Sequence, residues 1–174
     1  MVKAQLQKYL FRRNYITYTV LDGAAVPDLP VKLFEMQARN ICLYRGELSP
    51  DIVYVAPYLV QLLPETNFTN WLLADCWGKS WGIFAQTQLS LTEMRKHFRS
   101  LLTVYDETGK PLLFRYYDPR VFLTYVPSCN AAELELFFGD VKYYFAESDD
   151  ATVLQRYNFS KTELKKTTLD INQK

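Results

Sequence analysis

Hydrophobic residues recur along the chain at two periods, one typical of strands and the other typical of helices. Four segments rich in β-branched and aromatic side chains predict strands. These segments are residues 14–23, 56–63, 81–87 and 141–147. Five segments with helical spacing or helix boundary signals predict helices. They are residues 3–13, 27–40, 66–78, 90–102 and 131–139.

The clearest helix begins after Ser90, which has capping-box spacing to Glu93. Apolar residues recur behind this cap at helical spacing and form one face. They are Leu91, Met94, Phe98, Leu101 and Leu102. Arg95, Lys96 and Arg99 lie largely on the opposite side. The simpler interpretation of this basic face is solvation, and the alternative is docking of an acidic partner.

Turn and cap signals organise the region that follows. Gly109 lies between residues 102–107 and residues 111–117, which predicts a β-hairpin. Asp118 then fits the N-cap of a short helix, with Pro119 at its first position. Asp28 is likewise predicted to cap the helix that follows it.

The end of the chain is less hydrophobic. Residues 149–159 predict an edge strand, and residues 160–174 predict a polar helix or a loose tail. We therefore expect one main domain over residues 1–146 and a C-terminal strand, helix or tail over residues 147–174. Strands and helices alternate irregularly around at least one hairpin, which favours an α/β fold with a mixed sheet and helices packed on it.

Composition argues against several classes of protein. The net charge is +1, whereas nucleic-acid-binding proteins usually have a basic excess. The longest apolar run, residues 52–63, contains Pro57 and is too short to cross a bilayer. Three widely spaced cysteines, Cys42, Cys76 and Cys129, suggest reduced thiols. We expect a cytoplasmic protein that binds neither nucleic acid nor membrane.

The sequence also lacks the usual signatures of catalysis. His97 is the single histidine, so a Cys–His nucleophile would have to combine it with Cys42, Cys76 or Cys129. There is no nucleophile elbow, no phosphate-binding loop and no ligand spacing typical of zinc. We expect no catalytic residues, no metal and no cofactor.

Arg115, Asp118 and Arg120 stand within an otherwise apolar and aromatic segment. If residues 111–117 form a strand throughout, Arg115 projects beside apolar neighbours, where an unpaired charge is costly. Because Asp22 ends the first long strand in a similar setting, we predict an ionic cluster of these four residues. The alternative is that Asp118 only caps its helix while both arginines reach water.

Aromatic residues make up 16% of the chain, and most of them are expected in the core. Tyrosine and arginine also dominate the energetics of protein interfaces, which makes exposed examples candidate contact residues. The candidates are Arg95, Arg99, Tyr117, Arg120 and Tyr143.

Six short motifs occur in a fixed order over about residues 15–146. They are "YTVLDGA", "APYLVQL", "WGIF", "SLTEMRKHFRSLLTV", "LLFRYYDPRVF" and "FFGDVKYYF". This ordered set resembles the effector adaptor chaperones of the bacterial type VI secretion system. One departure is that Asp140 follows Gly139, where that family often has proline.

The resemblance implies a non-enzymatic cytoplasmic adaptor. Such adaptors bind a toxic effector protein, often through its N-terminal region, and help to load it onto the VgrG spike. The "RYYDPR" match carries over as a signature of the family and not as a contact with a partner. Two other hypotheses remain open, namely a small Cys–His enzyme similar to a hydrolase and a structural subunit of a protein complex.

Overall fold

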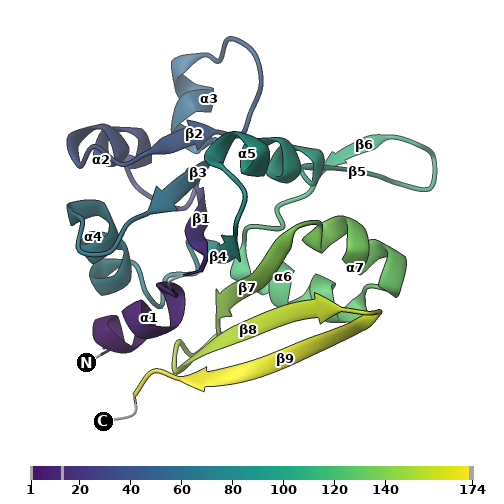
Figure 1. Ribbon diagram of the computed structural model, residues 1–174. Coiled ribbons are helices and arrows are strands. Elements are labelled where there is room, and N and C mark those ends of the chain that lie inside the picture. Colours follow the sequence, from purple (N-terminus) through teal and green to yellow (C-terminus); the bar gives the residue numbers. More distant parts are fainter. Residues whose placement is uncertain (1, 13, 173–174) are drawn as a thin grey trace.

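The computed structural model describes residues 2–12 and 14–172, and within them an antiparallel sheet of seven strands lies between two layers of helices (Figure 1). The strands of this main sheet are β1 (Ile16–Asp22), β2 (Asn40–Cys42), β3 (Pro57–Leu62), β4 (Gly82–Thr87), β7 (Val141–Glu147), β8 (Val153–Ser160) and β9 (Glu163–Asp170). The helices are α1 (Val2–Leu10), α2 (Leu29–Glu35), α3 (Pro50–Val55), α4 (Asn67–Asp75), α5 (Leu91–Ser100), α6 (Pro119–Tyr125) and α7 (Ala131–Phe138), and a 3₁₀ turn covers Val126–Ser128. The predicted α/β fold is confirmed.

The main sheet has the strand order β2-β3-β1-β4-β7-β8-β9. Each pair of neighbouring strands is antiparallel, including β1 with β3 and β4 with β7. The strand β7 crosses the expected domain boundary at residue 146, and β8 and β9 continue the same sheet. The two ends of the described chain meet near one corner of the molecule (Figure 1).

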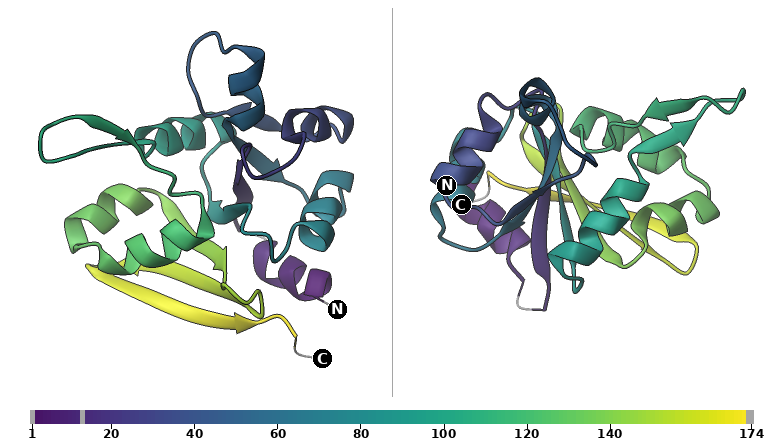
Figure 2. Two further views of the ribbon diagram at one scale, coloured as in Figure 1. Left: turned by 180° about the vertical axis from the view of Figure 1, so that it is seen from behind. Right: turned by 90° about the horizontal axis from the view of Figure 1, so that it is seen from above.

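Alternation along each strand divides the apolar side chains between two cores, one on each face of the main sheet. On β7, Tyr144 and Ala146 enter the core beneath α5, α6 and α7, whereas Phe145 enters the core beneath α1, α2 and α4. Figure 2 shows these two groups of helices on opposite sides of the sheet. The near-continuous burial of β1, β3 and β4 follows from this covering of both faces.

Several local signals act as predicted. Ser90 and Glu93 form the capping box that starts α5, and the Asp118 side chain caps α6 by accepting from the backbone N–H of Arg120. The predicted cap at Asp28 is wrong. The backbone of this residue adopts the left-handed α conformation with φ 53°, and its side chain makes no capping hydrogen bond to α2. A second capping box, between Asn130 and Glu133 at α7, was not predicted.

Three elements differ from the sequence-based expectation. Residues 160–174 were expected as a polar helix or a loose tail, but residues 163–170 form β9 and pair with β8 along its whole length. Residues 173–174 lie outside the described residues. The short strand β2 and the short helix α3 were also missed, and their brief apolar patterns explain why.

The predicted hairpin forms a separate two-stranded sheet of β5 (Thr103–Tyr105) and β6 (Pro111–Leu113). Its turn is stabilised by Asp106, whose carboxylate accepts from the backbone N–H groups of Thr108 and Lys110, and by Gly109 at φ 79°. The hairpin projects away from the three layers in each of the three views (Figures 1 and 2). The chain then enters the body of the protein and reaches α6.

Candidate partner-binding surface

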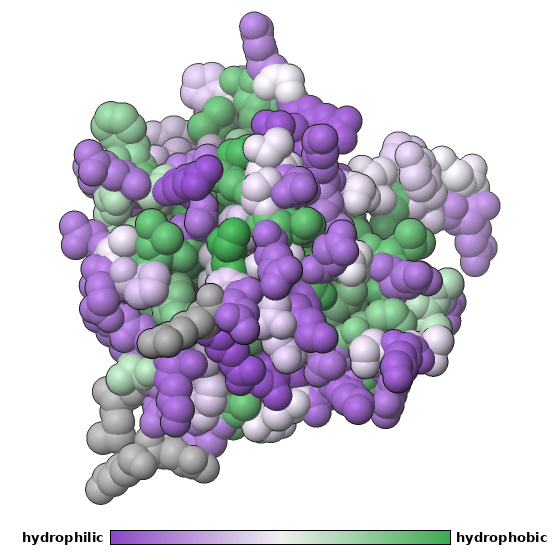
Figure 3. Space-filling model, in the orientation of Figure 1, coloured by the Kyte–Doolittle hydropathy of each residue, from purple (hydrophilic) through white to green (hydrophobic). Residues whose placement is uncertain are grey.

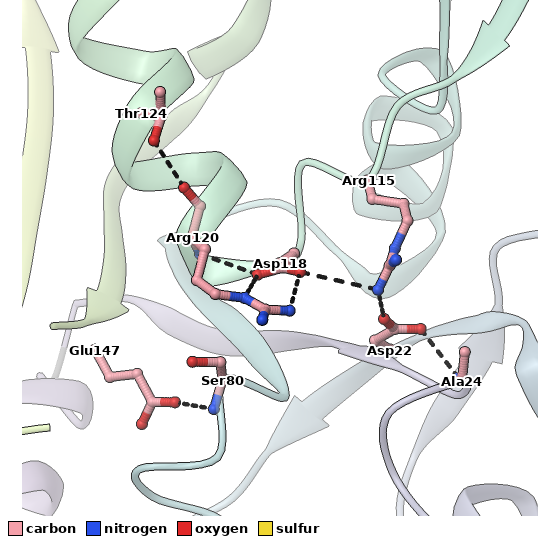
Figure 4. A network of polar contacts seen from close by, with 8 residues as sticks. All are labelled: Asp22, Ala24, Ser80, Arg115, Asp118, Arg120, Thr124 and Glu147. Carbon is pink, nitrogen blue, oxygen red and sulfur yellow. Dashed lines mark hydrogen bonds and ion pairs between the residues drawn. The ribbon is translucent and has the colours of Figure 1, made fainter. Parts of the chain in front are cut away.

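The base of the hairpin is anchored to the main sheet by an ion pair between Arg115 and Asp22 (Figure 4). Asp22 ends β1 and is 2% exposed, and its other carboxylate oxygen accepts from the backbone N–H of Ala24 at 3.0 Å. Gly23 lets the chain turn here, because a Cβ at this position would collide with the carbonyl oxygen of Ala56. The turn after β1 therefore holds a buried carboxylate against the segment that leaves the hairpin.

Asp118 forms the second half of the cluster. Its carboxylate accepts a bidentate pair of bonds from Arg120, with Nε 3.0 Å from Oδ1 and Nη2 2.7 Å from Oδ2. Arg115 Nη2 lies 3.9 Å from Asp118 Oδ2 and so links the two halves. Burial favours the protonated acid, but the hydrogen bonds from Arg120 outweigh it and lower the pKa of Asp118.

The predicted ionic cluster of Asp22, Arg115, Asp118 and Arg120 is thus present in the structure, and the bonds within it are drawn in Figure 4. The two carboxylates are buried, whereas both guanidinium groups are partly exposed. The cluster joins the end of β1, the end of the hairpin and the start of α6. It fixes the direction in which the hairpin leaves the protein.

The prediction that residues 111–117 form one strand is wrong, because β6 ends at Leu113. The chain turns at Tyr116 and Tyr117, which are both buried, and the Tyr116 hydroxyl donates to the carbonyl oxygen of Phe98 at 3.0 Å. The prediction that Tyr117 lies on a contact surface is corrected accordingly, because its side chain belongs to the core beneath α5, α6 and α7.

The hairpin instead exposes aliphatic and aromatic side chains that sequence reasoning did not select. We name this set the hairpin surface, and it consists of Val104, Tyr105, Leu112 and Leu113. Val104 pairs with Leu112 across the two strands and shares a face with it, while Tyr105 and Leu113 lie on the other face. Leu112 is 44% exposed on the first face and Tyr105 is 69% exposed on the second, so neither face of the hairpin is covered.

An open groove of about 610 Å³ runs beside the first turns of α6, and we name it the α6 groove. Its lining includes Phe114, Arg120, Val121, Thr124, Tyr125 and Ser128. Phe114 and Tyr125 pack edge to face with their ring centroids 4.6 Å apart, which gives the groove a firm aromatic wall. Hydrophobic surface is also visible near the protruding hairpin and over the helices beneath it (Figure 3).

A family described as a domain of unknown function, DUF4123, matches residues 17–136, which is more than half of the chain. The chain belongs to the DUF4123 family. Comparison with curated proteins and with solved structures found no match. The DUF4123 region contains the ionic cluster, the hairpin surface and the α6 groove, and it ends within α7.

Two further predicted contact residues lie on α5, also inside the DUF4123 region. Arg99 is held by the chain after β2, where its guanidinium donates to the carbonyl oxygens of Leu43, Cys42 and Tyr44 at 3.0, 3.0 and 2.9 Å. Arg95 is half-buried, and its Nε has no hydrogen-bond partner among the described residues.

Tyr143 lies beyond the DUF4123 region and on the opposite face of the main sheet, against the core beneath α1, α2 and α4. Two arginines cover its ring, since the guanidinium carbons of Arg12 and Arg156 lie 5.7 and 5.1 Å from the ring centroid. The five predicted contact residues therefore do not form one surface. Arg120 alone among them faces the α6 groove.

The cysteines and the histidine considered for catalysis are not arranged as a nucleophile and its base. Burial raises the pKa of all three thiols, and for Cys76 the pKa rises to about 12. His97 Nε2 lies 3.1 Å from the carbonyl oxygen of Phe137 and 3.1 Å from the hydroxyl of Tyr144, and burial lowers its pKa. Within the described residues, no hydrogen bond joins His97 to a cysteine.

The described part of the chain also contains no group of three or more histidine, cysteine, aspartate or glutamate side chains that could hold a metal ion. No helix within residues 2–12 and 14–172 is long and apolar enough to span a membrane.

Proposed function

We propose that this protein is a non-enzymatic adaptor of the bacterial cytoplasm that binds a type VI secretion effector and helps to load it onto the VgrG spike. The ordered motifs from "YTVLDGA" to "FFGDVKYYF" support the choice of this system through their resemblance to known adaptors. The observation that carries a binding function is the hairpin surface, which is apolar on both faces and is fixed at its base.

An isolated two-stranded hairpin is marginally stable in water, and aliphatic side chains on both faces gain little from folding while they stay exposed. A partner that covered the hairpin surface would bury these side chains and so supply the hydrophobic stabilisation that folding alone does not. The hairpin begins directly after α5 and continues into Phe114, whose backbone N–H donates to the carbonyl oxygen of Leu102 at 2.8 Å. A pre-oriented hairpin loses less entropy on binding than a mobile loop.

The α6 groove supplies a second contact next to the hairpin. The Arg120 side chain is 67% exposed, yet Asp118 already fixes its guanidinium through two bonds. An arginine held in this way remains able to donate to a partner while losing little conformational freedom. We propose that the effector, through its N-terminal region, covers the hairpin surface and the α6 groove together.

The alternative of a small Cys–His enzyme has less support. A nucleophilic cysteine needs a lowered pKa and access to solvent, whereas burial raises the pKa of Cys42, Cys76 and Cys129. The His97 Nε2 atom is within hydrogen-bond distance of a backbone carbonyl and a tyrosine hydroxyl and, among the described residues, not of a thiol. Replacement of His97 by alanine should therefore leave partner capture intact.

The test is co-expression with the candidate effector encoded by a neighbouring gene, followed by capture on a tag carried by the adaptor. The wild type should retain the effector, and the double variant Leu112→Ser/Leu113→Ser should retain at least about tenfold less, as expected for lost interface anchors. Phe34→Ser is the matched control, because Phe34 is 84% exposed on α2, which packs on the opposite face of the main sheet.

Failure of both the effector and the spike protein to co-purify with the wild type would contradict the adaptor function. Capture of the spike without any effector would instead favour the structural-subunit hypothesis. Removal of the N-terminal region of the effector should abolish capture if that region is the part that the adaptor holds.

A further inference from the structure

A second groove lies on the other side of β6, where the hairpin meets α5 and the chain that follows β2. It has a volume of about 380 Å³, and we name it the arginine groove. Its lining includes Leu43, Tyr44, Arg45, Arg99, Leu102 and Leu113. Leu113 belongs both to this groove and to the hairpin surface, so the two are continuous.

Three arginines gather at the arginine groove. Arg99 and the exposed Arg45 line it, and Arg95 lies one helical turn before Arg99 on α5. Burial lowers the pKa of Arg99, and the positive charges of Arg95 and Arg45 lower it further. The positive charges of Arg95 and Arg45 therefore both oppose that of Arg99.

No acidic side chain of the described residues offsets this repulsion through an ion pair. The ion pairs within residues 2–12 and 14–172 involve Arg115, Arg120 and Lys165, and none involves the three arginines of the groove. Arg95 Nε is in addition buried without any hydrogen-bond partner in that part of the chain, which is a costly state for a charged donor. An anion at the groove would relieve the repulsion between the arginines.

Arg99 is already oriented for such a ligand. Its Nε and Nη2 groups use three of the five guanidinium N–H donors on the carbonyl oxygens of residues 42–44. Its Nη1 has no hydrogen-bond partner among the residues that the structure describes, so two donors remain. A guanidinium fixed in this way can recognise a carboxylate with little loss of entropy.

We propose that the arginine groove holds an acidic and aliphatic segment of a partner polypeptide. Carboxylates of the segment pair with Arg45, Arg95 and Arg99, and its aliphatic side chains pack on Leu102 and Leu113. The proposal names the chemistry of one segment of the effector, and in this respect it rests on the proposed adaptor function.

The surroundings of the groove favour a peptide over a nucleic acid. Aliphatic side chains form much of its wall and Tyr44 is the one aromatic residue of the lining, whereas single-stranded nucleic acid is usually held by several aromatic side chains on which successive bases stack. The chain has a net charge of only +1, whereas binding to a phosphate backbone depends on an extended basic surface. A segment in which glutamate or aspartate alternates with leucine or isoleucine matches both the charge and the apolar wall.

The test uses the purified protein and a fluorescein-labelled peptide of about twelve residues in which pairs of glutamate and leucine alternate, a length that suits a groove-bound segment. Matched peptides carry glutamine or lysine in place of each glutamate. Fluorescence anisotropy gives the affinity, and NMR shifts of the Leu43 and Leu113 signals report the location. The glutamate peptide should bind at least about tenfold more tightly than either matched peptide, as is typical of charge-paired contacts.

Charge reversal supplies the variants. Arg45→Glu/Arg95→Glu should weaken binding of the glutamate peptide by at least about tenfold. Lys8→Glu/Lys161→Glu, which changes the net charge equally at two exposed sites elsewhere, should leave binding within about twofold. If the half-buried Arg95→Glu prevents folding, Arg45→Glu alone serves, since Arg45 is exposed and makes no ion pair within the described residues.

Several results would overturn the proposal. Equal binding of the glutamate and glutamine peptides would do so, as would binding that charge reversal leaves unchanged. Tighter binding of a single-stranded RNA of similar length would assign the groove to nucleic acid. A wild-type dimer that Arg45→Glu dissociates would assign it to a second copy of this chain.

The peptide measurement and effector capture fail independently. Capture of the effector by a protein that ignores the glutamate peptide would preserve the adaptor function and overturn the arginine-groove proposal. Binding of the glutamate peptide at Leu43 and Leu113 by a protein that captures no effector would support the arginine groove as a peptide site and contradict the adaptor function.

Discussion

The core beneath α5, α6 and α7 and the β5–β6 hairpin are both rich in apolar side chains, but they use them differently. In the core, the rings of Phe122, Phe137 and Tyr144 lie with their centroids 5.2 to 5.9 Å apart, and all three are buried. In the hairpin, every residue of both strands is exposed. The comparison teaches that hydrophobic sequence alone does not reveal whether a side chain stabilises this fold or is available to a partner.

The ionic cluster lies where these two regions meet. It joins the buried end of β1 to the segment between the hairpin and α6, so it stabilises the fold and orients the hairpin at the same time. Its two buried carboxylates depend on Arg115 from this connecting segment and on Arg120 from the first turn of α6. Loss of one arginine should therefore lower the free energy of unfolding of the whole protein.

The largest expected effect on stability comes from Arg115→Ala. It leaves the buried Asp22 carboxylate without its arginine, and an uncompensated buried charge of this kind costs about 2 kcal/mol when the lost partner was half-exposed. Urea unfolding measures the change. Lys165→Ala is the matched control, because the exposed pair of Lys165 and Glu163 at 3.7 Å should contribute less than about 0.5 kcal/mol. Equal losses in both variants would show that the cluster does not stabilise the fold.

A smaller effect is expected at the histidine of the core. Burial lowers the pKa of His97, so the unfolded chain takes up a proton near pH 6.5 while the folded chain does not. Stability rises with pH wherever the unfolded state binds more protons. The free energy of unfolding should therefore fall as the pH drops below about 6.5.

Because His97 is the single histidine of the chain, His97→Gln tests this assignment directly. The glutamine can still donate to the Phe137 carbonyl but does not titrate. Urea unfolding between pH 5.5 and 8 should show a weaker pH dependence in the variant than in the wild type. Identical slopes would assign the pH dependence to other groups.

The smallest effect on stability is expected in the hairpin. Leu112→Ser/Leu113→Ser removes side chains that are already 44% and 56% exposed, so the free energy of unfolding should change by less than about 0.5 kcal/mol. Thermal and urea unfolding provide the measurement. A loss comparable with that of Arg115→Ala would mean that the hairpin belongs to the folding core, and the contrast between the two regions would disappear.

The sequence predicted the parts of this structure that local chemistry determines. The capping box at Ser90, the cap at Asp118 and the turn at Gly109 depend on neighbouring residues, and each was found where it was expected. The pairing of Asp22 with Arg115 was also predicted, because a charge within an apolar segment needs a partner.

The sequence failed where distant residues decide the outcome. β9 contains little apolar surface and becomes a strand because β8 offers it a long edge to pair with. Tyr117 is buried because the chain leaves the strand at Phe114. The sequence has no glycine or proline at this point that would predict the end of the strand. The hairpin surface was missed because its leucines resemble those of a core strand, and only the fold shows that nothing covers them.

The most direct test of the central claim, that the exposed hairpin is the surface that a partner covers, is hydrogen exchange of the backbone amides of residues 103–113 with and without the candidate effector. In the free protein these amides should exchange rapidly, since the hairpin has only two strands and no cover. Binding of the effector should slow their exchange strongly while the amides of β9 stay unchanged. Slower exchange elsewhere in the molecule, with none in the hairpin, would contradict the claim.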